Sequence, residues 1–578
     1  MDDVASETRI LRANLARQKQ IFESKRNEVA LMEQAIQRHK NMVHLMLFPP
    51  IRPDRNPAYI SSLIKEKCAE LIQLQNAITA QETKLYDRES SLSQGCDKRL
   101  TQLKMQRTTI YANLEHLRSL LCPIRLLPVE LLSEIFTLSS DPVGSPSLSN
   151  PIFAVSHVCS SWRNIAIHKS ELWSSLRLEH VHFATRPDGV IPLAGLWLGR
   201  SGDHPLRLFF QLSLGATDTP GPTLIDLFVQ LIRLYTPHFA RWKDVFFEFH
   251  RFPGEHELFS DIPQNASLPH LERFGMTAST VAVADLLKIF QLLGQAPKLK
   301  RLTWITKAQI QAPMSMFSQL TQLEVGAEHS LANALTILSH AKCLRILDII
   351  VFVRSGSIST NVVQVVNDSL QEFTLTCAGE ISVLFDSLTL PAIQHLHVSK
   401  TFSWEVTGPS IWSQWSFVQL LCRSKCDLTS LGVINYRIPS DEVLVLLRHL
   451  SPSLVKFKIE GYHLSITDEV LTALTFPSED PLAAMSSDTD DPPTILCPML
   501  RDLQMLGCMS TTDGVLARMV ESRQDPPAGL AKLTKGVFGL DSTKSCQDRA
   551  RILALNAGQT HNMIVEETGW IVEETGWA

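Results

Sequence analysis

The sequence lacks the motifs by which most enzyme and metal sites are recognised. Its 578 residues contain no GxSxG, no HExxH, no phosphate-binding glycine loop and no dinucleotide fingerprint. The 11 cysteines are scattered without a CxxC pair, and no cysteine or histidine cluster has the spacing of zinc ligands. These absences favour a non-catalytic chain that needs no metal or cofactor and keeps its thiols reduced.

Long apolar runs and a strong charge of one sign are also missing. No run approaches the ~20 apolar residues that span a bilayer, and the N-terminal MDDVASETRILR lacks the apolar core of a signal peptide. Residues 1–122 hold 19 Lys and Arg against 14 Asp and Glu, and the remainder holds 35 against 45. Neither part has the clustered basic charge of a nucleic-acid-binding domain. We therefore expect a protein of the cytoplasm or nucleus with no membrane or nucleic-acid partner.

Apolar residues at heptad spacing are present in residues 1–122. One series is interrupted by a proline-rich elbow near residues 48–57, and a second series restarts after it and slips in phase past Gly95. The two series are Leu15, Phe22, Val29, Ile36 and Val43, and then Ile64, Leu71, Ile78, Leu85 and Leu92. Sustained heptads predict a coiled-coil arm. Either the first helix folds back on a longer second helix, or the second helix pairs with a second copy of the chain.

Residues 123–178 carry apolar residues at helical spacing in two pieces, separated by the loop-like insert SSDPVGSPSLSNP. The order is LPxELLxxIF, then VCxxWR, then LWxxL. The residues are Leu127, Pro128, Glu130, Leu131, Leu132, Ile135 and Phe136, then Val158, Cys159, Trp162 and Arg163, then Leu172, Trp173 and Leu176. Helices this short must pack on each other or on a partner.

This order of motifs resembles the F-box, and the arm before it with leucine-rich sequence after it resembles the large F-box-like families of mushroom-forming fungi. The resemblance implies a short three-helix domain that docks on a Skp-type adaptor, and through it on a cullin-RING ubiquitin ligase. It also implies which residues bind the adaptor. They are Leu127, Pro128, Leu131, Leu132, Ile135, Phe136, Val158, Cys159 and Trp162.

Residues 179–545 repeat the pattern apolar-x-x-apolar-x-apolar, with most first positions 21–28 residues apart. Clear examples are Leu299/Leu302/Trp304, Leu344/Leu347/Ile349 and Leu454/Phe457/Ile459, and the first weak example is Trp173/Leu176/Leu178. The end of each pattern alternates as a strand does, and helix-spaced apolar segments fit between the strands. The period is that of degenerate leucine-rich repeats, which stack into an α/β solenoid.

A solenoid of this kind presents a binding surface made of the polar positions between the strand apolar residues. The target-binding candidates are Arg301, Thr303, Gln322, Glu324, Arg345, Asp348, His395 and His397. Residues 478–493 form an acidic, proline-rich loop, and residues 546–578, which end in a duplicated IVEETGW, are expected to be a poorly ordered tail.

The sequence thus predicts a mixed α and α/β chain with a helical arm over 1–122, an F-box-like domain over 123–178 and a leucine-rich-repeat-like solenoid over 179–545. The function that fits is a substrate receptor of a Skp-cullin-F-box ubiquitin ligase, which acts by proximity and contributes no chemistry. The alternative is a scaffold that dimerises through its coiled coil and has no role in ubiquitin ligation.

Overall fold

The computed structural model describes most of the chain beyond residue 56. The described residues are 57–86, 93–121, 124, 127–140, 151–179, 187–212, 222–249, 258–259, 261–263, 266–278, 282–306, 313–353, 364–401, 412–461, 465–477, 495–527, 529–540, 545–556 and 562–567. The chain forms two compact units, Met1–Ser139 with Pro151–Ile167, and Ser140–Asn150 with His168–Ala578. The described part of the first unit is helical, whereas the second unit contains a long sheet.

The described part of the arm is a pair of helices, α2 (Pro57–Tyr86) and α3 (Ser93–Leu120), which pack against each other. Lys104 Nζ lies 2.9 Å from Glu82 Oε1, and Arg107 Nη1 donates to Gln75 Oε1 at 3.1 Å, so the two helices run antiparallel. The sequence predicted one long second helix with a change of phase past Gly95. The structure instead has two helices there. The expected first helix and the elbow lie outside the described residues.

The motif that resembles the F-box contains three short helices, α4 (Val129–Ser139), α5 (Pro151–Val158) and α6 (Ser160–His168). Pro128 precedes α4 and its carbonyl accepts a hydrogen bond from Leu132 N at 3.1 Å, which closes the first helical turn. Helix α4 packs on α5, and the rings of Phe136 and Trp162 join α4 to α6. The insert between α4 and α5 falls mostly in residues 141–150, which are outside the described residues.

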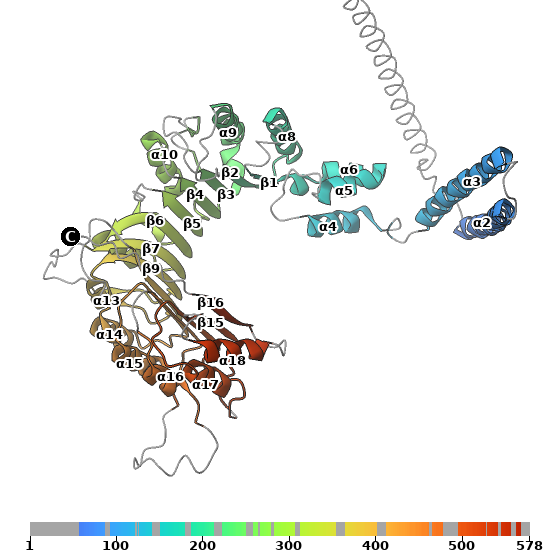
Figure 1. Ribbon diagram of the computed structural model, residues 1–578. Helices are drawn as coiled ribbons and strands as arrows, with labels where there is room; N and C mark the ends of the chain where they lie inside the picture. Colours follow the sequence, from blue (N-terminus) through green and yellow to red (C-terminus); the bar gives the residue numbers. More distant parts are fainter. Residues whose placement is uncertain are drawn as a thin grey trace, which may run out of the picture. The chain divides into compact units, whose positions relative to one another are not determined.

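The second unit is built on a parallel sheet of 14 described strands that pair almost wholly in sequence order (Figure 1). The strands are β1 (Ser175–Leu178), β2 (Leu206–Leu212), β3 (Trp242–Phe249), β4 (Arg273–Ala278), β5 (Arg301–Thr306), β6 (Gln322–Ser330), β7 (Ile346–Val353), β9 (Glu372–Gly379), β11 (His395–Lys400), β12 (Ser430–Ile434), β13 (Lys456–Glu460), β14 (Asp502–Leu506), β15 (Lys535–Leu540) and β16 (Asn562–Glu567). Strands β8 (Val365–Val366) and β10 (Leu388–Thr389) form a separate small pair.

The apolar pattern of the sequence becomes two buried ladders that cross the sheet in register. One ladder pairs Phe274 with Leu302 and continues through each neighbouring strand to Leu503. The other runs two residues further along, from Met276 through Trp304 to Met505, and every member of both ladders is 3% exposed or less. The weak upstream pattern is also a strand, since Leu176 of β1 pairs with Leu208 of β2.

Helices connect the strands and cover the face that carries these ladders. In Figure 1, α9, α10 and α13–α17 lie along the outer side of the curved sheet, which leaves its inner face to the polar positions. The helices are α8 (Pro187–Arg200), α9 (Pro222–Tyr235), α10 (Val283–Gly294), α11 (Met314–Phe317), α12 (Leu331–His340), α13 (Ser382–Ser387), α14 (Gln414–Ser424), α15 (Ser440–Leu450), α16 (Asp468–Leu474), α17 (Val515–Ser522) and α18 (Cys546–Asn556). Ser330 caps α12 by accepting a hydrogen bond from Asn333 N at 3.3 Å.

The sheet continues past residue 545, where the sequence predicted a poorly ordered tail. Helix α18 packs on α17, and β16 pairs with β15 along six residues. Strand β15 lacks the apolar pattern because Gly536 stands where the other strands have a larger apolar residue, such as Leu503 of β14 and Met563 of β16. A side chain there would meet Phe538 Cε2 at 2.6 Å and Met563 Sδ at 2.7 Å, so these two residues already fill the core position.

Candidate functional site

Helix α4 carries an apolar stripe on its exposed side. Leu131, Ile135 and Leu138 follow each other at i, i+4 and i+7, so they share one face of the helix, and Pro128 extends that face by one turn. These leucine and isoleucine side chains are 52%, 42% and 78% exposed in the order of the sequence. We name Pro128, Leu131, Ile135 and Leu138 the apolar stripe. Exposed apolar surface of this kind marks an interaction site.

The adjacent face of α4 is internal. Leu132 is 5% and Phe136 is 2% exposed, and the Phe136 ring centroid lies 5.0 Å from that of Trp162. Trp162 N in turn donates to Cys159 Sγ at 3.5 Å, at the start of α6. Leu132 and Phe136 were predicted to bind the adaptor, but they form the core of the helices instead. Burial leaves them no surface to offer a partner.

The other predicted adaptor-binding residues are exposed or half-buried. Val158 is exposed, whereas Leu127, Cys159 and Trp162 are half-buried. The residues that sequence reasoning missed are exposed ones, Ile124, Val129 and Leu138. Leu138 could have been found, because it lies seven residues after Leu131 and so repeats the helical spacing of the stripe.

A second candidate surface is the inner face of the sheet, opposite the described helices α9, α10 and α13–α17. Between the buried ladders each strand presents alternate residues to this face, and sheet pairing brings them into two polar rows. Of the predicted target-binding residues, all but one lie on these rows. The exception is Arg345, which is exposed but precedes β7.

One hollow on this face, of about 730 Å³, lies over β2–β5. We name it the basic hollow. It is lined by Arg207, Leu208, Phe209, Lys243, Asp244, Phe246, Glu272, Arg273, Lys300 and Arg301. Arg273 Nη1 lies 3.6 Å from Asp244 Oδ2, and Lys243 Nζ lies 3.7 Å from Glu272 Oε1. Burial raises the pKa of Asp244, while the arginines around it act in the opposite direction. Arg301 is the predicted candidate that lines this hollow.

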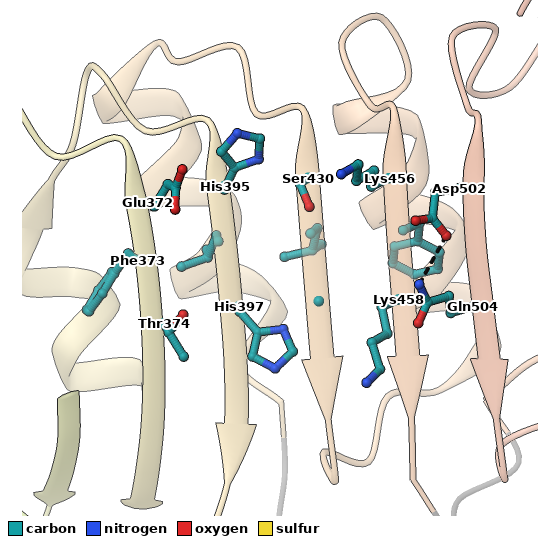
Figure 2. Close-up of a pocket in the computed structure, with 14 residues that line it drawn as sticks. Glu372, Phe373, Thr374, His395, His397, Ser430, Lys456, Lys458, Asp502 and Gln504 are labelled. Carbon is teal, nitrogen blue, oxygen red and sulfur yellow. Dashed lines mark hydrogen bonds between the residues drawn. The ribbon is translucent and has the colours of Figure 1, made fainter. Parts of the chain in front are cut away.

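A smaller hollow of about 300 Å³ lies over β9–β14, and we name it the histidine hollow. His395 and His397 both line it, and Figure 2 shows both side chains on β11, with His395 nearer the start of the strand. The His397 ring lies across Gly432, where a side chain would come within 2.2 Å of its Nδ1. Burial, and then the charge of Lys458, lower the pKa of His397, which favours the neutral imidazole. Lys458 Nζ is paired with Glu460 Oε2 at 2.9 Å.

Acidic side chains separate the two hollows. Thr303 Oγ1 donates to Glu324 Oε2 at 3.1 Å, and Asp348 follows on the next strand in register with Glu324. Burial and the neighbouring Glu324 carboxylate raise the pKa of Asp348 to about 6. The predicted residues Gln322, Glu324 and Asp348 therefore lie between the hollows and line neither. The inner face is positive over β2–β5 and acidic over β6 and β7.

Neither a metal-binding cluster nor a membrane-spanning helix is found among the described residues. Among them, no group of three or more His, Cys, Asp or Glu side chains is placed to hold a metal ion. No helix in the described part of the chain is long and apolar enough to cross a bilayer. The arrangement can bind other molecules through an apolar stripe and through a charged strand surface.

Comparison with known proteins identifies one part of the chain. A search of curated proteins found no match to the chain. The family model described as F-box-like matches residues 124–179, which contain α4, α5, α6 and β1. This match covers α4, which carries the apolar stripe, and leaves the strands after β1 unassigned. The apolar stripe therefore belongs to an F-box-like domain at residues 124–179.

Proposed function

We propose that this chain is the substrate-recognition subunit of a Skp-cullin-F-box ubiquitin ligase. The apolar stripe binds a Skp-type adaptor, and the inner face of the sheet, which we interpret as degenerate leucine-rich repeats, binds the target protein. F-box proteins are generally non-catalytic adaptor subunits, so the expected mechanism is proximity between target and conjugating enzyme. Such a complex would operate in the cytoplasm or nucleus.

The observation that carries the proposal is the exposure of the apolar stripe. A three-helix unit is too small to bury every apolar side chain, and Leu131, Ile135 and Leu138 remain accessible while Leu132 and Phe136 complete the core. A few large apolar anchors usually supply most of an interface's binding free energy. The F-box-like match supports a Skp-type adaptor as the partner.

The test is a binding measurement between the full chain and a purified Skp-type adaptor. Removal of two anchors, in the Leu131→Ala/Ile135→Ala variant, should cost about 2 kcal/mol for each, or roughly a thousandfold in Kd for the pair. Leu287→Ala on α10 is the matched control because Leu287 is also 52% exposed but lies in the sheet unit. Undiminished binding by the double variant, or no binding by the unmodified chain, would contradict the proposal.

The alternative function is a scaffold that dimerises through its arm. Ile72 on α2 and Met105 on α3 are exposed by more than half, so this helix pair leaves apolar surface uncovered. The dimer stays a prediction, and the molar mass of the chain by light scattering tests it. A monomeric mass at all concentrations would contradict dimerisation, and a dimer that binds no adaptor would favour the scaffold.

A further inference from the structure

An aromatic stack lies across the inner face at the edge of the basic hollow. The guanidinium of Arg177 on β1 lies 4.2 Å from the ring centroid of Phe209 on β2. The rings of Phe209 and Phe246 on β3 stack with centroids 5.2 Å apart and planes 9° from parallel. Beyond them is Gly275 on β4, where a side chain would lie 2.1 Å from Phe246 Cδ2. The glycine therefore makes room for the Phe246 ring to lie over its backbone.

Each ring thereby has a neighbour on both of its faces. Phe209 lies between Arg177 and Phe246, and Phe246 lies between Phe209 and the backbone at Gly275. Only ring edges are left for a ligand, and ring edges carry the positive part of the aromatic quadrupole. A nucleic-acid base binds an aromatic side chain through the ring face. The stack is therefore an apolar floor with positive edges and offers no platform for bases.

Positive charge exceeds negative charge around this floor. The lining residues include five Lys and Arg side chains and two acidic side chains, Asp244 and Glu272. Each acidic side chain already has a cation within 4 Å, Arg273 for Asp244 and Lys243 for Glu272. Within the described part of the chain, Arg207, Lys300 and Arg301 have no ion pair of this kind. Arg207 and Arg301 are exposed and lie in the same row across the sheet, on either side of Asp244 and Arg273.

We propose that the basic hollow binds an acidic peptide segment of the target protein, with Asp or Glu side chains on Arg207 and Arg301 and an apolar side chain on the edges of Phe209 and Phe246. Guanidinium groups bind carboxylates through paired hydrogen bonds. The acidic Glu324 and Asp348 beyond β5 confine the segment to β2–β5 by repulsion. Asp244 within the row repels a doubly charged phosphate placed beside it more strongly than it repels a singly charged carboxylate. This inference rests on the target-binding part of the proposed function.

The experiment uses the full chain and three fluorescein-labelled probes of equal net charge in an anisotropy titration. The probes are a peptide of about twelve Asp, Glu and Leu residues, a serine and leucine peptide carrying phosphoserines, and an oligouridine. The acidic peptide should bind most tightly, and its affinity should fall as salt rises because the contacts are ionic. The Arg207→Ser/Arg301→Ser variant should lose at least tenfold in affinity for it.

Two further variants make the result specific. Arg448→Ser removes an exposed arginine on α15, which covers the opposite face of the sheet, and should change the affinity less than twofold. Phe246→Leu keeps an apolar side chain but removes the ring edge, and should weaken the peptide several-fold without changing its salt dependence. Absence of acidic-peptide binding, tighter binding of oligouridine or phosphopeptide, or an equal loss in Arg448→Ser would overturn the inference. Because Leu131→Ala/Ile135→Ala should retain peptide binding, failure of the adaptor site and failure of the hollow can be told apart.

Discussion

Apolar side chains are partly exposed in the F-box-like helices, whereas those of the two ladders of the parallel sheet are buried. In the array of strands, Leu302, Leu347 and their register partners are buried almost completely, and the inner face of the sheet is mostly polar apart from the stack of Phe209 and Phe246. In α4, Leu131 and Leu138 are more than half exposed although leucines of the same helix, such as Leu132, are buried. The array comprises many units that cover one another, whereas three short helices cannot cover every apolar side chain. The difference indicates where a partner protein is needed.

The largest effect should come from the buried ladder of the array. Trp304 is fully buried and its ring centroid lies 4.6 Å from that of Phe290 on α10. Trp304→Ala should lower the free energy of unfolding by about 3–5 kcal/mol, because it removes a large side chain and leaves a cavity. Urea unfolding monitored by circular dichroism measures this. Gln322→Ala on the inner face is the control and should change stability by about 0.5 kcal/mol or less. Equal effects would show that the two faces do not differ as described.

The same contrast can be tested within one helix of the F-box-like domain. Phe136→Ala removes the ring that contacts Trp162 and should cost about 3 kcal/mol, with loss of adaptor binding through unfolding. Leu131→Ala should leave stability nearly unchanged and still weaken adaptor binding. Tryptophan fluorescence and protease resistance report folding, and titration with the adaptor reports binding. If Leu131→Ala unfolds the helices, the division of α4 into a core face and a binding face is wrong.

A buried polar side chain in the array offers a third comparison, since Asn367 is fully buried whereas the leucines of the apolar stripe are exposed. Asn367 Nδ2 donates to Leu338 O and Ala341 O at 3.0 Å, and Oδ1 accepts from Leu370 N at 3.1 Å. Asn367→Ala leaves these backbone groups without their partner and should cost about 2 kcal/mol. Asn367→Asp should cost more, because a carboxylate oxygen then faces two carbonyls. Midpoints of thermal unfolding rank the stability of the unmodified chain, Asn367→Ala and Asn367→Asp. An Asn367→Ala variant as stable as the unmodified chain would contradict the prediction.

The strands were predictable from the sequence because one local pattern encodes them. Leu344, Leu347 and Ile349 repeat the spacing of Leu299, Leu302 and Trp304, and burial on one face of a sheet fixes that spacing. Strand β15 was not predicted because Phe538, and Met563 on the next strand, fill the core where the pattern expects an apolar residue in place of Gly536. The sequence did not predict the basic hollow for a related reason. Phe209, Phe246 and Gly275 are far apart in the chain and meet only through sheet register.

The division of α4 could be predicted only in part. Helical spacing places Leu131, Ile135 and Leu138 on one face and Leu132 and Phe136 on the adjacent face. Both faces are apolar, so the spacing cannot show which of them packs on α5 and α6. That choice depends on Trp162, whose ring lies against Phe136. For this reason the predicted adaptor-binding residues mixed core residues with surface residues.

The smallest predicted effect concerns the acidic residues between the two hollows. Burial and Glu324 raise the pKa of Asp348 to about 6 in the folded chain, against about 4 when unfolded. The folded state therefore holds this proton more tightly, and stability is lost as pH rises from about 4 to about 6. Asp348→Asn cannot ionise, so its stability relative to the unmodified chain should increase over that pH range. Because Asp348 is only half-buried, solvent screening limits the gain to about 1 kcal/mol. Urea midpoints at pH 4.5 and pH 7.5 measure it, with Glu324→Gln expected to give part of the same gain. A difference that does not change with pH would show that Asp348 titrates normally and would contradict this prediction.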